Sequence, residues 1–95
     1  MRNYELVTIV NPELDEEGIA RIREEVNKFI SDKNGIVDEV NQWGKRKLAY
    51  PIKKFMEGNY SLTRFELEPD LIKELEAKIR TSEEVLRHLV VKVGD

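Results

Sequence analysis

The hydrophobic positions at the start of the chain follow a period of two. Residues 3–10 place Tyr4, Leu6, Thr8 and Val10 on one side, and Glu5, Val7 and Ile9 on the other. Side chains of a β-strand alternate between its two faces, and β-branched and aromatic residues are common in strands. We therefore predict a strand over residues 3–10.

The pattern then changes to steps of three and four. Asn11 and Pro12 interrupt the strand, and the acidic residues within 13–17 suit the positive N-terminal end of a helix. The apolar residues that follow recur at helical spacing: Ile19, Ile22, Val26, Phe29 and Ile30. This stripe predicts an amphipathic helix that ends at Asn34-Gly35.

Two extended segments occupy the middle of the chain. Residues 36–50 read as a long strand in which Gly44 marks a bulge, and Pro51 favours a position at the sheet edge. A second strand is predicted over residues 59–67. Because Glu57-Gly58 directly precedes that strand, we expect the two strands to form a hairpin that turns there.

The last part of the chain predicts a second helix and a fourth strand. Pro69 suits a first helical turn, and an apolar stripe follows it: Leu71, Ile72, Leu75 and Ile79. Residues 86–93 read as the final strand, which gives the order βαββαβ. We expect residues 1–95 to form one α+β domain with a ferredoxin-like fold. Its four-stranded antiparallel sheet carries both helices on one face, with strands 3–10 and 59–67 at its centre.

Such a fold leaves the second face of the sheet uncovered, and we call it the open face. If Tyr4 and Leu6 face the helices, then Val7 and Ile9 lie on the open face. By the same alternation Tyr60 and Leu62 lie there too. Large exposed apolar patches are uncommon on monomers, so this face indicates a partner or a ligand. A register shifted by one residue would exchange the two faces.

Composition excludes several classes of protein. The chain has no cysteine, and therefore no disulfide, thiolate nucleophile or cysteine-based metal site. Apolar runs such as Leu89-Val90-Val91 are too short to span a membrane, and the N-terminus has no secretory pattern, so we expect a cytoplasmic protein.

Enzyme signals are scarce. His88 is the single histidine, and beside Leu89 in a strand it reads as a structural or surface residue. The turn Asn11-Pro12-Glu13 offers an acid and a missing amide where a phosphate loop needs donors, which also argues against an acylphosphatase-like enzyme. We therefore expect no catalytic residues, no metal site and no cofactor.

The charge is unevenly distributed. The net charge is -3, yet residues 40–56 contain no acidic residue and five cations: Lys45, Arg46, Lys47, Lys53 and Lys54. Cations attract phosphates, and the interleaved aromatic residues could stack on bases or pack against a protein. An edge strand protected by lysines is the alternative, and spacing alone supports both. Residues 58–65 keep little of the RRM signature, which argues against base stacking across the sheet centre.

Several motifs resemble the bacterial small-subunit ribosomal protein S-six (S6) family. They are Tyr4-Glu5, Asn11-Pro12, Gly-Lys-Arg-Lys-Leu-Ala-Tyr-Pro-Ile at residues 44–52, Gly58-Asn59-Tyr60 and Val90-Val91-Lys92. The likeness runs through nearly the whole chain, and the stretch from Arg46 to Ile52 is highly specific. The resemblance implies the same ferredoxin-like fold and a structural role in the small ribosomal subunit, in a cytoplasmic, ribosome-bound protein.

The resemblance also implies two macromolecular partners. Proteins of this family pair with ribosomal protein S-eighteen (S18), and the heterodimer binds the central domain of small-subunit ribosomal RNA during platform assembly. The partner would then supply positive charge that this acidic chain lacks. The implied RNA-facing residues, completed by Lys45 and Lys53 of the basic segment, are Arg2, Lys45, Arg46, Lys47, Lys53, Lys54, Arg87 and Lys92. The implied partner surface, with Val7 and Ile9 of the open face, is Val7, Ile9, Leu48, Tyr50, Tyr60 and Leu62.

A function of another class remains open from the residues alone. A small-ligand or regulatory domain could use the same open face, and it would bind a metabolite without any requirement for RNA. An acyl-phosphate enzyme is motivated only by catalytic proteins that share the fold class.

Overall fold

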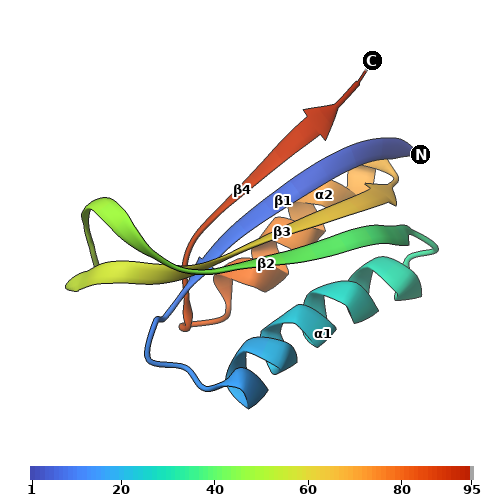
Figure 1. Cartoon of the computed structure of the whole chain (residues 1–95). Helices are drawn as coiled ribbons and strands as arrows, with labels where there is room; N and C mark the ends of the chain where they lie inside the picture. The colour runs from blue at the N-terminus through green and yellow to red at the C-terminus, as the bar shows by residue number, and fades with distance from the viewer. Residues whose placement is uncertain (95) are drawn as a thin grey trace.

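Strands and helices follow one another in the computed structural model, which describes residues 1–94, in the order predicted (Figure 1). The elements are β1 (Arg2–Val10), α1 (Glu16–Asp32), β2 (Ile36–Ile52), β3 (Phe55–Leu67), a 3-10 turn (Pro69–Leu71), α2 (Ile72–Arg80) and β4 (Val85–Val93). Pro69 begins a separate 3-10 turn, so the second helix starts three residues later than its proline indicates.

The strands form one antiparallel sheet in the order β2-β3-β1-β4. The two central strands are therefore β1 and β3, as predicted. Figure 1 shows α1 and α2 together on one side of the sheet. The ferredoxin-like arrangement is confirmed.

Local interactions fix both ends of α1. The Asp15 carboxylate accepts a hydrogen bond of 2.8 Å from the backbone N–H of Gly18, and Glu16 and Glu17 stabilise the positive end of the helix. At the other end Asn34 adopts a φ of 65°, and the Gly35 N–H donates to the Ile30 carbonyl at 2.7 Å. This helix end lies where the Asn-Gly pair predicts it.

The core lies between the sheet and the helices. Tyr4 and Leu6 of β1 pack there with Phe65 of β3, and the Tyr4 and Phe65 rings stack at 5.6 Å. The helices contribute Ile30 and Leu75, both fully buried. The remaining buried members of this cluster are Val10, Val26, Leu67, Ile79 and Val85. The core therefore uses the face of β1 that the sequence assigns to the helices.

The third strand also turns two small polar residues toward the helices. Ser61 and Thr63 line the same small cavity as Leu6 and Val26. The hydroxyls of Ser61 and Thr8 are hydrogen bonded at 2.7 Å, which satisfies both polar groups inside the fold.

β2 and β3 continue as a two-stranded arm beyond the last pairing of β1 with β3, which joins Val10 to Asn59. We call residues 46–58 the arm, and Figure 1 shows it extending past the end of β1. The predicted turn at Glu57-Gly58 is wrong, because β3 begins at Phe55 and Ile52 pairs with Phe55. The turn is Lys53-Lys54, whose φ values of 49° and 75° have the signs of a type I′ turn.

The open face is not bare at the arm. Val7 pairs with Leu62 and Ile9 with Tyr60, so these four residues share the face away from the helices, as the alternation predicts. Ile9 and Leu62 are nevertheless only 8% exposed and lie outside the main core cluster. Sheet alternation alone did not predict this burial, because the burial of Ile9 depends on how closely the arm approaches β1.

Candidate nucleic-acid and partner interface

The arm and its base carry the five cations of the basic segment. All five side chains are exposed, with Lys53 and Lys54 at the tip and Lys45, Arg46 and Lys47 at the base. Within residues 1–94 none of the five forms an ion pair. The arm and its base therefore carry a local excess of positive charge, although Glu57 also lies on the arm and the whole chain is acidic.

Strand pairing sorts the base of the arm into two faces. Arg46 pairs with Gly58, and Lys47 pairs with Glu57. Side chains directly opposite in an antiparallel pair lie on the same face, and Gly58 is two residues from Tyr60. Arg46 therefore shares the open face with Tyr60, whereas Lys45 and Lys47 project to the other side.

Gly58 allows the arm to lie close to β1. A Cβ atom at this position would be 2.3 Å from the Ile9 Cγ2 atom and 3.6 Å from the Leu48 Cδ2 atom. Ile9 and Leu48 thus meet over the glycine, which accounts for part of the burial of Ile9. Two predicted partner-surface residues lie side by side here, largely through packing within the chain itself.

Tyr50 connects the arm to the far edge strand. The Arg87 guanidinium donates a hydrogen bond to the Tyr50 hydroxyl, and it lies 5.3 Å from the centre of the Tyr50 ring. Arg87 belongs to β4, at the opposite edge of the sheet from β2. The arm must therefore curve over the end of the open face, and the Arg87 side chain holds it there.

An aromatic pair occupies the base of the arm. The register shifts between Gln42 and Gly44, where Gly44 has a φ of 81°. Trp43 lies in this bulge, and its ring stacks on that of Tyr60 at 6.4 Å and 20°. Trp43 remains 44% exposed. The sequence shows both aromatic residues and the Gly44 bulge, but nothing in the spacing pairs the two rings.

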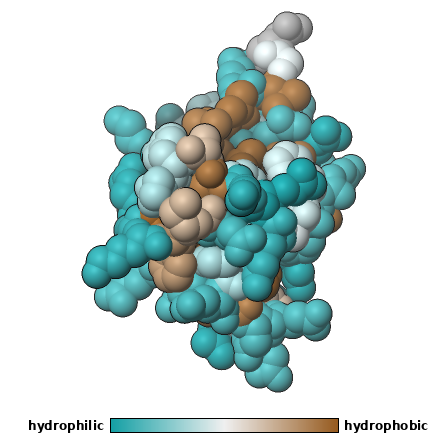
Figure 2. All heavy atoms as spheres, turned by 60° about the vertical axis from the view of Figure 1, so that its left-hand side comes forward, coloured by the Kyte–Doolittle hydropathy of each residue, from teal (hydrophilic) through white to brown (hydrophobic). Residues whose placement is uncertain are grey.

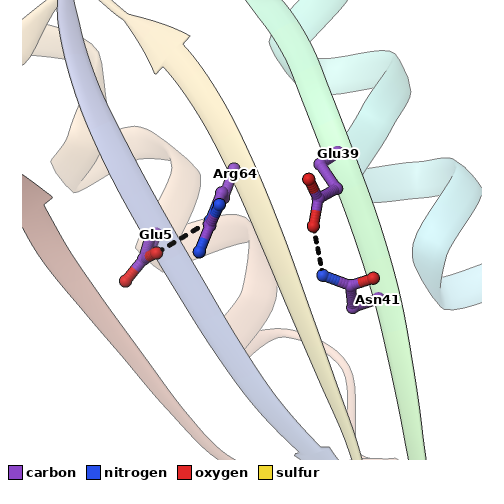
Figure 3. Close-up of polar contacts among 4 residues, drawn as sticks. All are labelled: Glu5, Glu39, Asn41 and Arg64. Carbon is purple, nitrogen blue, oxygen red and sulfur yellow. Dashed lines mark hydrogen bonds and ion pairs between the residues drawn. The ribbon is translucent and has the colours of Figure 1, made fainter.

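Away from the arm, the part of the open face formed by β2, β3 and β1 is polar. The Arg64 Nε donates to a Glu5 carboxylate oxygen at 2.9 Å, and the Asn41 amide donates to Glu39 (Figure 3). Near this group the pKa of Glu66 is raised, chiefly by charge repulsion from the Asp38 carboxylate, then by partial desolvation and by a hydrogen bond with Asp38. This part of the open face does not fit the expectation of an apolar surface.

β4 exposes a row of apolar residues on the open face. Leu89 pairs with Val7, and the alternate residues Val91 and Val93 continue the row. Their exposed fractions are 58%, 44% and 41%. Figure 2 shows apolar spheres running as a band toward the upper end of the molecule. Sequence reasoning missed this row, although the alternation in residues 86–93 contains it.

The predicted RNA-facing residues do not form one patch. Arg2 pairs with Leu67 and Lys92 with Tyr4, so both lie at the end of β1 remote from the arm. At about 3.3 Å per residue, the length of β1 separates the two ends by roughly 25 Å. The structure thus groups the five cations of the basic segment with Arg87 and leaves Arg2 and Lys92 apart. The binding roles of all of these residues remain predictions.

The described residues provide little for other chemistry. Residues 1–94 contain no group of three or more histidine, aspartate and glutamate side chains that could hold a metal ion. Among the helices of the same residues, none has the length and apolar character needed to cross a membrane. The His88 Nε2 atom lies 3.1 Å from a Glu76 carboxylate oxygen, a contact that ties β4 to α2.

Comparisons with known proteins agree on one family. Residues 3–92 match the family model of ribosomal protein S6. The small ribosomal subunit protein bS6 of Clostridium novyi (strain NT) is 46% identical over 91 residues, which are 96% of each chain. The bS6 protein of Clostridium botulinum (strain 657) is also 46% identical over 91 residues, 96% of this chain and 97% of that one.

Solved structures give the same result. The crystal structure of 30S ribosomal protein S6 from Thermotoga maritima superposes with a TM-score of 0.90 at 36% identity, and the match covers 96% of this chain and 86% of that one. The C-terminal domain of the MgtC protein from Mycobacterium tuberculosis has a TM-score of 0.66 at 10% identity, over 97% and 87% of the two chains. The second likeness shows a shared fold alone.

Proposed function

The chain belongs to the ribosomal protein S6 family, and from this premise we propose that it binds the central domain of small-subunit ribosomal RNA together with ribosomal protein S18. The family consists of structural, non-enzymatic components of the small ribosomal subunit. We further propose that the chain acts on the ribosome in the cytoplasm, during assembly of the platform.

The observation that carries this proposal is the group of unpaired cations on the arm and at its base. Five cations without an ion pair among residues 1–94 favour a polyanionic ligand, because phosphate binding draws its free energy largely from counterion release. The net charge of -3 disfavours tight RNA binding by the chain alone. A basic protein partner that shares the RNA surface accounts for both facts.

The partner surface is proposed from the open face near the arm. Val7, Leu48 and Tyr60 are half-buried there and Tyr50 is exposed, while Ile9 and Leu62 are mostly covered within the chain. Ile9 and Leu62 would therefore support the exposed residues from beneath and offer little area of their own. Aromatic residues with apolar neighbours are the usual anchors of a protein interface.

Salt dependence tests the RNA contact. Affinity for a central-domain RNA fragment is measured across a salt series, with and without S18. If about four phosphates are contacted, log K should fall with log salt at a slope of roughly -3 to -4. We expect tight binding only with S18, and a flatter slope when Arg46, Lys47 and Lys54 are all replaced by alanine.

The control replaces Lys28, Lys33 and Lys73, which are exposed cations in or directly after the helices and away from the arm. That triple variant removes the same charge and should keep the parent slope. An arm variant with an unchanged slope would exclude the arm from the RNA contact. Equal affinity with and without S18 would contradict the shared surface.

A further inference from the structure

Trp43 stands out among the residues that the proposed contacts leave unexplained. Its ring is 44% exposed, and one of its faces stacks on Tyr60. We propose that the outer face of Trp43 is a stacking site for an unpaired RNA base, with Arg46 placed to contact the adjacent phosphate. This inference rests on the proposed binding of RNA and adds to it a specific base contact.

The bulge orients the tryptophan. β2 shifts register between Gln42 and Gly44, and the positive φ of Gly44 lets the chain turn there without a side-chain clash. The Tyr60 ring then supports the indole from beneath, with only 20° between the planes. An aromatic ring fixed on one side and open on the other is a platform of the kind on which bases stack.

Charge favours RNA over a protein as the occupant. Arg46 shares the open face with Tyr60 on the adjacent stretch of strand. Its side chain is exposed and has no ion pair among residues 1–94. An apolar protein surface would leave this cation uncompensated, whereas a phosphate flanking a stacked base would pair with it.

The chain contains a single tryptophan, so its fluorescence reports on this site alone. We would titrate the chain at low salt with a short single-stranded oligoadenylate and follow Trp43 emission. An end label on the oligonucleotide gives an independent measure of binding. We expect saturable quenching that coincides with binding. A duplex of the same length should bind without comparable quenching, because its bases are already stacked.

Two substitutions separate stacking from charge. Trp43→Leu keeps an apolar side chain over Tyr60 but removes the stacking ring, and it should weaken oligoadenylate binding about 5- to 150-fold with an unchanged salt slope. Trp43→Phe should restore most of the affinity. Leu89→Ala, at an exposed apolar residue on β4, should bind like the parent. Thermal unfolding of each variant checks that the fold is intact.

The outcomes distinguish this inference from the proposed function. Bound oligoadenylate without quenching, or Trp43→Leu with parental affinity, would overturn the stacking site. The proposed function would survive that result if alanine at Arg46, Lys47 and Lys54 flattened the salt slope, because the arm would then still contact RNA. A Trp43→Leu variant that loses S18 but keeps the oligonucleotide would assign the ring to the protein interface and would also overturn the inference. If oligoadenylate does not bind at low salt, the inference is overturned as well.

Discussion

At Gly58 the arm comes so close to β1 that only a hydrogen atom fits between them. A Cβ atom would lie 2.3 Å from the Ile9 Cγ2 atom, which is fixed to the branched carbon of its side chain and cannot easily move away. Gly58→Ala should therefore lower the free energy of unfolding by about 1–3 kcal/mol, as overpacking does elsewhere. Urea denaturation measures this change.

Ile9 provides the control for that substitution. In an Ile9→Ala background the clashing methyl group is gone. Gly58→Ala should then lower the free energy of unfolding by much less than it does in the parent chain. The two substitutions should then be strongly coupled in a double-mutant cycle. Additive effects, or a Gly58→Ala variant as stable as the parent, would contradict this packing of the arm.

Glu66 gives the chain a pH-dependent term in its stability. The Asp38 carboxylate raises the pKa of Glu66 above its ordinary value of 4.5, while the N-terminal ammonium group opposes the shift. An acid with a raised pKa in the folded state stabilises the fold below its unfolded pKa, and that contribution is lost as the pH rises through the folded pKa.

Replacement of Glu66 by glutamine tests the sign. At neutral pH, Glu66→Gln removes the repulsion from Asp38, so the thermal midpoint should rise slightly above that of the parent. Well below pH 4.5, where Glu66 is protonated, the two midpoints should converge. A variant less stable than the parent at neutral pH would contradict the assigned cause.

At the scale of elements, the turn of the arm is strained. Lys53 and Lys54 have positive φ values, where type I′ turns prefer asparagine and glycine and where an L-residue pays about 1–2 kcal/mol. Lys54→Gly should therefore raise the free energy of unfolding by about 0.5–1 kcal/mol. If Lys54 contacts a phosphate, the same change should reduce the RNA salt slope by about 1.

A lysine elsewhere in the arm provides the matched control. Lys47 lies within β2 and is not among the residues with positive φ, so Lys47→Gly should destabilise the chain by about 0.5–1 kcal/mol. Chemical denaturation should therefore show a higher free energy of unfolding for Lys54→Gly and a lower one for Lys47→Gly. A loss of stability in both would show that the turn at Lys54 is not strained.

The turn also shows where sequence reasoning reaches its limit. Glu57-Gly58 has the composition of a turn, but Gly58 is needed for close packing against Ile9, while Lys53-Lys54 forms the turn without the usual residues. Periodicity predicted every strand and both helices, because each buries one stripe or one face. It could not predict the tip of the arm, where side chains are exposed and no stripe is buried.

For the whole molecule, the candidate site is predictable only in part. The five cations are neighbours in sequence, so composition alone located them. The contact of Tyr50 with Arg87 and the stacking of Trp43 on Tyr60 join distant segments. Both contacts depend on the curvature and bulges of β2, and these produce no periodic pattern of hydrophobic residues in the sequence. The family resemblance implied the same fold as the periodicity and added the class of function. Neither residue pair was visible in it.

The whole chain combines an acidic body with a basic arm. This division is consistent with an RNA-binding protein that shares the RNA with a partner. The arm attracts RNA phosphates locally, while the acidic body limits nonspecific binding to RNA. The central claim is that the arm holds the chain on the small ribosomal subunit.

Cosedimentation with small ribosomal particles at moderate salt tests this claim most directly. The parent chain should sediment with the particles. The variant with alanine at Arg46, Lys47 and Lys54 should dissociate at lower salt, because it makes fewer phosphate contacts. A parent chain that stays in the supernatant, or an arm variant that sediments as the parent does at every salt concentration, would contradict the account.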